Sequence, residues 1–596
     1  MAEGLSEKVS ALLLPVVHNP AQYIGGEVNE VRKESAGVEV SVALAFPDTY
    51  AVGMSNLGLA ILYEAVNRLP WAAAERVYCP WTDAVELMRR QGIPLFSWES
   101  RRAVREFNVV GVTLQHELSY SNVLLLLDLA GITLHAEARR DAEPLVIAGG
   151  PLADCCEPLA DFLDLVLLGE GEEAFPAVLA AYRELRPKRL SRRALLLELA
   201  CRFPFLYVPR FYQSHYHADG TLAACSPTEP DVPAVISRAY VKDLDAAAYP
   251  TAPLVPHTAA VHDRIAIEIM RGCPQRCAFC HAGHTRGPVR TRSLDRIVEI
   301  AWQSYLATGH DTVSLLSLSS SDYPGLGELV RRLYARFEGR HVGISLPSLR
   351  VDRQLRDVPP QIAGVRREGL TVAVEAAGDR LRQAIGKRVT DADLLATLRA
   401  AYEAGWHTVK LYFIVGFPGE TDADIDAIAE LAGQVSVLRR EVGGGPATVN
   451  VTVSWLVPKP HTPLAWAPMQ TEDYFRGARR RLLAAARVHG KLPVRYKFHN
   501  LGRSLLEGVF ARGDRRLGRV LETAYRQGAC FDAWDECFRH DLYLDAFRQG
   551  GLDPAFYAHR PRGENEVLSW DHLAGQDRDQ LYRRYQRLIE MLAGSS

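Results

Sequence analysis

Three cysteines within eight residues constrain this chain more than any other feature. Their positions are Cys273, Cys277 and Cys280. The apolar run 265–270 before them predicts a buried strand, and Pro274 disfavours a helix, so we expect the three on a loop at a strand end. Cysteine thiolates hold iron–sulfur clusters, and three of them on a four-iron cluster would leave one iron open. An open coordination position separates catalytic metals from structural ones.

The spacing, with Phe279 directly before the third cysteine, resembles the signature of the radical S-adenosylmethionine (SAM) superfamily. The resemblance implies a 4Fe-4S cluster whose open iron would chelate the amino and carboxylate groups of SAM. One electron, from a flavodoxin- or ferredoxin-like donor, would then cleave SAM to methionine and a 5′-deoxyadenosyl radical. The metal ligands would be Cys273, Cys277 and Cys280.

A zinc knuckle is the alternative interpretation, with His281 as the fourth ligand of a Cys₃His site. Zinc sites more often pair their cysteines as Cys-x₂-Cys, and no second pair lies nearby. The other seven of the ten cysteines are scattered, which favours buried apolar roles over a disulfide framework.

Composition indicates an ordinary soluble globular protein. Of its 596 residues, 48% are hydrophobic and 23% charged, and the formal net charge of −2 points to no class of partner. The first residues lack the basic and apolar regions of a signal peptide. No apolar run reaches the ~18 residues of a membrane span, so we expect a cytoplasmic location and no membrane partner.

Strand-like and helix-like segments alternate between residues 36 and 190, which predicts a parallel sheet covered on both faces. In such Rossmann-like sheets ligands bind outside the carboxyl ends of strands, where glycine allows close backbone approach. Polar or glycine-rich loops follow four of the predicted strands. The candidate ligand-binding residues there are Gly53, Met54, Ser55, Asn56, Thr113, Gly149, Gly150, Gly169, Glu170 and Gly171.

Placed ahead of the cysteine triad, this domain resembles the cobalamin-binding domain of cobalamin-dependent radical SAM proteins. The resemblance implies that the ten loop residues bind cobalamin. The Asp-x-His-x-x-Gly ligand motif of methionine synthase-like domains is absent, because His18, His116 and His135 have no Asp two residues earlier. We therefore expect a cobalt without a protein histidine ligand. A degenerate domain that has lost the cofactor would share this absence.

From Arg264 the alternation resumes, and six predicted strands indicate a partial (β/α)₆ barrel of the radical SAM type. In β/α barrels the chemistry lies at the C-terminal strand ends. The resemblance places Phe279 at the SAM site and assigns the SAM ribose to Glu375, at the end of the fourth strand. It assigns the adenine to Gly416 and Phe417, after the fifth. A salt bridge is the alternative for Glu375, and a plain turn for Gly416.

The segment 471–527 is basic, with 14 Lys or Arg against 5 Asp or Glu. A solvated helix face is one interpretation, and an RNA-binding surface is the other. Four segments together resemble an uncharacterised bacterial family of cobalamin-binding radical SAM proteins, which implies a small radical-SAM-linked partner protein. They are 53–56, 280–281, 457–463 and 507–516.

The sequence thus predicts an α/β protein with five segments. They are a polar lead-in (1–35), a Rossmann-like cobalamin-binding-type domain (36–190), a Pro-rich connector (191–260), a radical SAM (β/α)₆ core (261–468) and a mainly helical C-terminal region (469–596). The hypothesised reaction is cobalamin-dependent methylation of an unactivated carbon. The alternatives are an RNA-modifying enzyme of the methylthiotransferase-like type and a non-catalytic zinc-binding module. Substrate and oligomeric state do not follow from the sequence.

Overall fold

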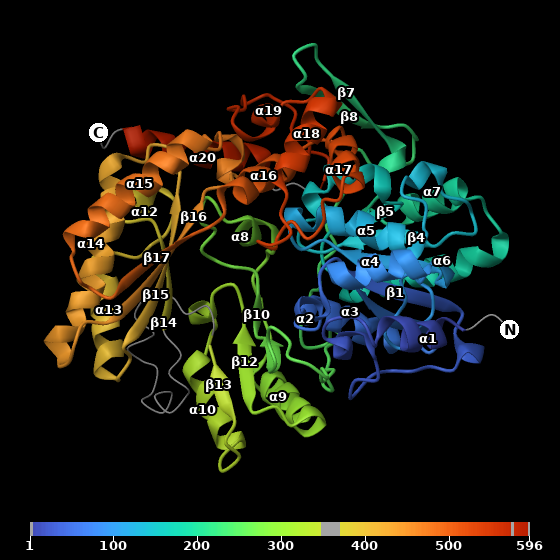
Figure 1. Cartoon of the computed structure of the whole chain (residues 1–596), viewed down its shortest axis with the longest axis horizontal. Helices are drawn as coiled ribbons and strands as arrows, with labels where there is room; N and C mark the ends of the chain where they lie inside the picture. Colours follow the sequence, from blue (N-terminus) through green and yellow to red (C-terminus); the bar gives the residue numbers. More distant parts are fainter. Residues whose placement is uncertain (1–3, 347–369, 574–576, 594–596) are drawn as a thin grey trace.

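The computed structural model describes residues 4–346, 370–573 and 577–593 (Figure 1). A six-stranded sheet organises the first part, in the order β2-β1-β3-β4-β5-β6. Its strands are β1 (Val40–Phe46), β2 (Ala72–Tyr78), β3 (Val109–Thr113), β4 (Leu145–Gly149), β5 (Leu165–Leu167) and β6 (Leu206–Tyr207). The first five are parallel, and β6 pairs antiparallel to β5. This confirms the expected Rossmann-like sheet, whose strand order reverses between β1 and β3.

Helices connect the strands of this sheet. They are α2 (Tyr50–Gly53), α3 (Leu57–Asn67), α4 (Thr82–Gln91), α5 (Tyr120–Ala130), α6 (Gly171–Leu185) and α7 (Arg192–Arg202). The side chain of Asn56 caps α3 by accepting a 2.8 Å hydrogen bond from the Leu59 amide. All seven residues of β1 are buried, as a central parallel strand requires.

Two segments differ from the expectation. The lead-in is helical in α1 (Leu5–Lys8) and the turn that continues it to Leu13, because apolar residues four apart bury one face. The connector begins with α7, a stretch without proline. The hairpin expected after it is present as β7 (Tyr212–Tyr216) and β8 (Leu222–Pro227).

The second half contains the expected six parallel strands, divided among the described residues between two sheets, β13-β12-β9 and β14-β15-β16-β17. They are β9 (Ile265–Glu268), β12 (Thr312–Leu316), β13 (Gly343–Ser345), β14 (Leu370–Glu375), β15 (Thr408–Val415) and β16 (Thr448–Trp455). A further parallel strand, β17 (Val494–Phe498), extends the second sheet beyond residue 468. Its charged alternate residues concealed it from sequence reading.

Helices α13 (Asp391–Glu403), α14 (Asp422–Leu438) and α15 (Glu472–Val488) cover one face of the sheet β14–β17 (Figure 1). The sheet β13-β12-β9 packs against α9 (Leu294–Thr308) and α10 (Leu326–Arg336) in a core of its own. All three helices α13–α15 thus lie on the same face of the sheet β14–β17.

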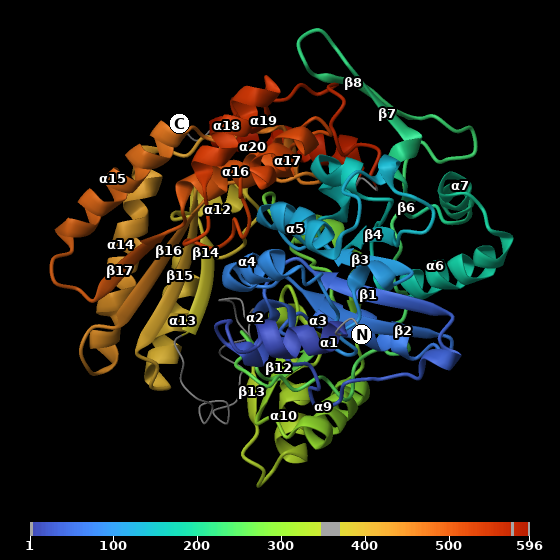
Figure 2. The ribbon, with the colours of Figure 1, turned by 45° about the vertical axis from the view of Figure 1, so that its right-hand side comes forward.

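The C-terminal region is mainly helical, as expected. Its helices are α16 (Leu501–Ala511), α17 (Leu517–Arg526), α18 (His540–Gly550), α19 (Pro554–Ala558) and α20 (Arg578–Ala593). Helix α17 packs on α5, so this region shares the core of the N-terminal sheet (Figure 2). None of the described helices has the length and apolar character that crossing a membrane requires.

Candidate functional site

The cysteine loop lies between β10 (Met270–Arg271) and the short helix α8 (His281–Thr285), as the preceding strand predicted. At its start Gly272 has a φ of 86°, and a Cβ there would lie 3.0 Å from backbone atoms of Pro288 and Val289. At its end the side chain of Cys280 caps α8, because its Sγ accepts a 3.3 Å hydrogen bond from the Gly283 amide. The loop backbone is thus fixed on both sides of the triad.

All three thiols are half-buried on this loop. Burial raises the pKa of the Cys277 thiol to about 11 and also raises that of Cys280. Free thiolates are therefore unfavourable here, whereas a bound metal would stabilise them. The donor set fits a thiolate-ligated metal.

The distances between the three cysteine sulfurs help to decide which metal they could bind. Among the described residues, only His116, Glu117 and Glu507 place three such ligand atoms within 4.8 Å of one another. Zinc–sulfur bonds of about 2.3 Å would bring cysteine sulfurs to within ~4 Å of one another, closer together than the three sulfurs lie in this structure. The proposed fourth zinc ligand, His281, instead has Nε2 3.1 Å from Oδ1 of Asp154.

The SAM candidates of the fourth and fifth strands lie beside this loop. Phe279 and Phe417 meet edge to face, with ring centroids 5.9 Å apart. Gly416 has a φ of 112°, and its amide donates a 2.7 Å hydrogen bond to Glu420. A Cβ on Gly416 would lie 2.7 Å from the Phe475 ring, so the turn depends on glycine.

Glu375 ends β14 at a strand irregularity, with the left-handed φ of 70° that non-glycine residues rarely adopt. Burial raises the pKa of its carboxyl group, against the opposing effect of Lys387, whose Nζ lies 3.5 Å away. Strained backbone of this kind persists where surrounding structure imposes it, commonly at functional sites. The salt-bridge alternative had Arg380 or Arg382 as the partner of Glu375, but these pair with Asp424, Asp379 and Asp391, and the ion pair of Glu375 is with Lys387.

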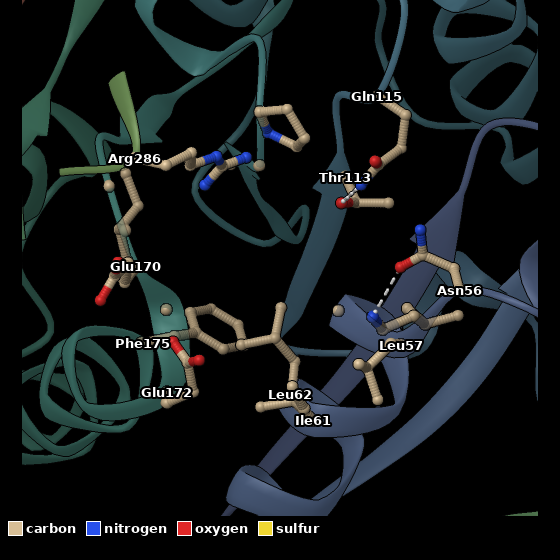
Figure 3. Close-up of a pocket in the computed structure, with 18 of the residues that line it drawn as sticks. Asn56, Leu57, Ile61, Leu62, Thr113, Gln115, Glu170, Glu172, Phe175 and Arg286 are labelled. Atoms are coloured by element: carbon tan, nitrogen blue, oxygen red, sulfur yellow. Dashed lines mark hydrogen bonds between the residues drawn. The ribbon is translucent and has the colours of Figure 1, made fainter. Parts of the chain in front are cut away.

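A cavity of about 400 Å³ lies between the strand ends of the N-terminal sheet and the cysteine loop (Figure 3). Its far wall comes from the end of β12 and from Glu268, Met270, Arg271 and Gly272. Seven of the ten predicted cobalamin residues line it: Asn56, Thr113, Gly149, Gly150, Gly169, Glu170 and Gly171. Leu57, Ile61, Leu62 and Phe175 make one side apolar (Figure 3).

The other three predicted residues are not part of the cavity lining. A Cβ on Gly53 would lie 2.4 Å from the Tyr78 ring. Met54 Sδ accepts hydrogen bonds of 3.1 Å from Arg76 and Tyr78. Ser55 Oγ accepts from the His262 amide at 2.9 Å. The three residues therefore make packing contacts with β2 and with the segment before β9.

Glu170 joins the cavity to the cysteine loop. Its carboxylate lies 2.7 Å from Arg290 and 3.1 Å from Arg271, two residues before the first cysteine. Although burial opposes it, Arg290 and Arg271 lower the pKa of Glu170. The residue predicted as a ligand contact therefore holds the two halves of the chain together.

Sequence reasoning missed a polar cluster around Asp154 on the loop after β4. Asp154 pairs with Arg238 at 2.7 Å and with His281, and its carbonyl accepts from Nε2 of the buried His461 at 2.9 Å. Burial would raise the pKa of Asp154, but His281 and Arg238 hold it well below its usual range. Only the position of His281 beside a candidate ligand could have signalled this cluster.

Arg286 is a second missed residue. It lines the cavity from the second half of the chain (Figure 3). Burial and the nearby Arg238 both lower the pKa of its guanidinium. Two arginines, Arg271 and Arg286, thus line the cavity beside its glycine-rich and apolar stretches.

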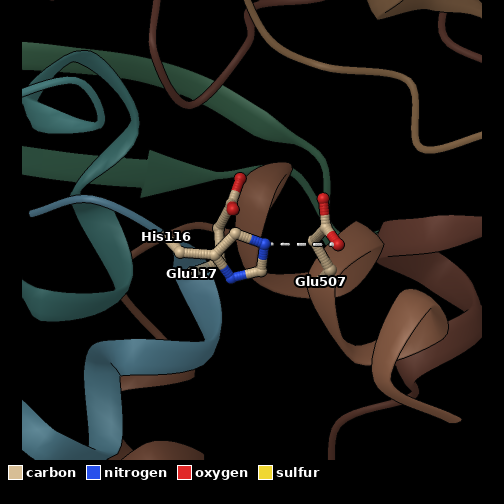
Figure 4. A group of neighbouring side chains, drawn as sticks. All are labelled: His116, Glu117 and Glu507. Carbon is tan, nitrogen blue, oxygen red and sulfur yellow. Dashed lines mark ion pairs between the residues drawn. The ribbon is translucent and has the colours of Figure 1, made fainter. Parts of the chain in front are cut away.

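The side chains of His116, Glu117 and Glu507 lie close together (Figure 4), and an ammonium group links the two carboxylates. Lys459 Nζ lies 2.5 Å from Glu117 and 2.8 Å from Glu507. His116 Nδ1 accepts from the Leu118 amide, so Nε2 carries the proton and faces Glu507 at 3.6 Å. With that proton and the lysine in place, the group is an ion-pair network between α16 and the loop after β3.

The basic segment 471–527 is partly neutralised within the protein. Six of its 14 cations pair with carboxylates: Arg476, Arg481, Arg503, Arg515, Arg516 and Arg526. Arg512 is buried. The segment as a whole is therefore no continuous cationic surface, although Arg495 and Lys497 on β17 are exposed.

Comparison with known proteins finds similar sequences, two of which bear on this chain. The chain is 25% identical over 514 residues to an uncharacterized protein of Methanocaldococcus jannaschii, covering 86% of this chain and 97% of that one. It is 32% identical over 222 residues to the tRNA-2-methylthio-N(6)-dimethylallyladenosine synthase of Sorangium cellulosum, covering 33% of this chain and 44% of that enzyme. The chain thus spans less than half of that enzyme's length.

Among solved structures, the fold is similar to TsrM from Kitasatospora setae, a radical SAM methyltransferase solved with cobalamin and a [4Fe-4S] cluster bound. The TM-score is 0.50 at 14% identity, covering 85% of this chain and 99% of that chain. Residues 58–209 match the family described as radical SAM proteins, N-terminal, and residues 267–432 match the radical SAM superfamily. The chain is therefore a radical SAM enzyme.

Proposed function

We propose that this enzyme uses a 4Fe-4S cluster, SAM and cobalamin to methylate an unactivated carbon of its substrate. The observation that carries the proposal is the shared wall of the cavity: Arg271 and Gly272, which lead into the cysteine triad, also line the cavity at the ends of the Rossmann-like strands. When bound, the cluster supplies the electron that cleaves SAM, and cobalamin supplies the methyl group.

Cys273, Cys277 and Cys280 would hold the cluster. Three half-buried thiols that are more widely spaced than the ligands of one zinc ion suit a multi-iron cluster, and the fixed backbone of Gly272 and Gly283 orients them. The non-catalytic zinc-module alternative has no support in this arrangement.

Glu375, Gly416, Phe417 and Phe279 would hold SAM. The carboxylate of Glu375 is buried and has lost most of its hydration. Hydrogen bonds from hydroxyl groups, such as those of a ribose, would compensate for that loss. The paired rings of Phe279 and Phe417 form an apolar wall against which adenine can pack.

The cavity fits a broad, flat cofactor, because glycine backbone replaces side chains at several strand ends. Gly111, Gly149, Gly150, Gly169 and Gly171 all line it. No histidine is among its lining residues in the described part of the chain. Cobalamin there would have no histidine ligand from this protein, in agreement with the missing Asp-x-His motif. Arg286 would place a positive charge within the cavity.

The partners stay part of the proposal. A flavodoxin- or ferredoxin-like protein would donate the electron, in the cytoplasm, and a small radical-SAM-linked protein would act with the enzyme. An RNA-modifying activity of the methylthiotransferase-like type is the second candidate, favoured by the 32% identity over 222 residues to a tRNA-modifying relative.

Three measurements test the proposal. Protein expressed with cobalamin and purified anaerobically should contain iron, sulfide and cobalt, and should release 5′-deoxyadenosine from SAM under reducing conditions. A protein with iron but without cobalt would contradict the methylation proposal and leave the radical SAM assignment intact. With a candidate substrate, transfer of a deuterated methyl group from SAM would be followed by mass spectrometry.

A further inference from the structure

One face of the sheet β14–β17 is exposed at several positions of the described residues. Along β15, Val409, Leu411 and Phe413 are fully buried in the core with α13 and α14. Side chains alternate along a strand, so Lys410 and Tyr412 lie on the opposite face. Both are exposed, Tyr412 at 38%.

Strand pairing arranges this face in rows. Lys410 pairs with Asn450, which pairs with Arg495. One step along the strands, the row is Tyr412, Thr452 and Lys497. The face therefore carries three cations, two neutral hydrogen-bonding side chains and one aromatic ring. Neighbouring strands lie ~4.8 Å apart and alternate residues ~6.6 Å apart along a strand, so the three long cationic side chains can reach one ligand.

No carboxylate of the described residues lies within ion-pair distance of Lys410, Arg495 or Lys497. Six other cations of the segment 471–527 do have such partners. Like charges gathered on one face of a sheet repel each other. An arrangement that leaves them unpaired on one face is suited to an anionic ligand.

The face leads to the candidate SAM site. Ile414 continues the alternation beyond Tyr412 and belongs to the same hydrophobic cluster as Ala278 and Phe279 of the cysteine loop. Four residues of strand separate Ile414 from Lys410, or ~13 Å. A ligand whose anionic group lies at Lys410 can therefore extend toward the cluster loop with its other end.

We propose that this face binds a nucleotide unit of the substrate, with its phosphate on Lys410, Arg495 and Lys497 and its base against Tyr412. Guanidinium and ammonium groups bind phosphate strongly, and arginine does so with two parallel hydrogen bonds. Aromatic side chains stack on bases of any sequence. The proposal deepens the proposed function and rests on it for the reaction. The nucleotide could be free or a residue of single-stranded RNA.

Binding to the full-length, cluster-reconstituted protein tests the proposal. The probes are 5′-GMP, which avoids the adenosine of SAM, and a single-stranded RNA 10-mer, both followed by calorimetry at two salt concentrations. The variant replaces Lys410, Arg495 and Lys497 by alanine. The matched control replaces the exposed Arg480, Arg487 and Lys491 by alanine, an equal change of charge outside this face.

The proposal expects at least a tenfold loss of affinity in the first variant and little change in the control. A loss of affinity for GMP would identify a free nucleotide as the ligand. A loss of affinity for RNA alone would identify a single-stranded RNA as the ligand. Tyr412→Ala should weaken nucleotide binding several-fold without affecting competition by inorganic phosphate. Equal losses in both triple variants, or no binding by the unaltered protein, would overturn it. Deoxyadenosine release from SAM should persist in the first variant. If the unaltered protein releases no deoxyadenosine, the proposed function fails, whatever the result for nucleotide binding.

Discussion

His281, the residue after the third cysteine of the triad, places Nε2 3.1 Å from Oδ1 of Asp154 in the N-terminal domain. The same carboxylate lies 2.7 Å from Arg238 of the connector. One buried carboxylate thus fixes the candidate cluster loop relative to the loops that line the cavity. The two halves of the chain depend on each other at the point where their proposed cofactors would meet.

Replacing Asp154 by alanine should destabilise the enzyme substantially. The change leaves the partially buried Arg238 and His281 without their partner, and breaking a buried ion pair costs about 3–5 kcal/mol. Thermal unfolding of the full chain should show a clear fall in midpoint. Asp231→Ala, at an exposed position in the connector, is the control and should change little. An unchanged midpoint in the Asp154 variant would mean that the contact does not support the junction.

Glu375→Gln should weaken SAM binding without affecting the cluster. The substitution keeps the shape of the side chain but removes the negative charge that would accept both ribose hydroxyls, a loss of about 1.5–3 kcal/mol. Equilibrium binding of SAM to reconstituted protein would measure it, with iron content as the internal check. Glu430→Gln, exposed on α14, should bind SAM normally. Equal affinity in both variants would remove Glu375 from the site.

Thr113→Trp should exclude cobalamin, because the larger side chain would fill the cavity at the end of β3. Cobalt per chain, after expression with cobalamin, should fall severalfold while iron is retained. Thr113→Val has nearly the volume of threonine and loses only the 3.0 Å hydrogen bond from Gln115, so its cobalt content should match the unaltered protein. Full cobalt in the tryptophan variant would place cobalamin elsewhere.

Glu420 should make stability depend on pH. Burial raises its pKa to about 7, against hydrogen bonds from Tyr474 and the Gly416 amide. The folded protein holds this proton more tightly than the unfolded chain does. The contribution of Glu420 to stability therefore falls as pH rises from about 4.5 to about 7, by ~3 kcal/mol in total.

Glu420→Gln removes this titration, so the variant should gain stability relative to the unaltered protein between pH 5 and pH 8. Thermal midpoints of both proteins across that range measure the difference. Glu430→Gln should show a constant offset instead. If the difference in thermal midpoint between Glu420→Gln and the unaltered protein is also constant across this pH range, the Glu420 carboxyl titrates in its ordinary range.

Local sequence signals predicted much of the fold and part of the site. The cysteine triad and the glycine loops at strand ends are features of a few consecutive residues, and the structure places Gly149, Gly169 and Cys280 at strand ends or loops as expected. Buried alternation in β15 and β16 likewise identified strands that form. These signals act within a single strand–loop–helix unit.

Contacts between distant segments gave no such signal. Asp154 meets residues 127 and 307 positions later in the chain, His281 and His461. β17 was missed because Arg495 and Lys497 interrupt its apolar pattern, and only the pairing with β16 identifies it as a strand. Gly53 to Ser55 resembled a ligand loop, yet they face Tyr78, Arg76 and His262. Tertiary packing decided each of these cases.

The central claim is that Cys273, Cys277 and Cys280 hold a 4Fe-4S cluster with one iron open to SAM. The most direct test is electron paramagnetic resonance of the reduced, anaerobically reconstituted protein, recorded with and without SAM alongside iron and sulfide analysis. The account predicts a 4Fe-4S signal that changes when SAM binds and is lost when the three cysteines are replaced by serine, but not in Cys201→Ser, an exposed cysteine. A colourless protein that contains zinc, or a cluster signal that survives the triple replacement, would contradict it.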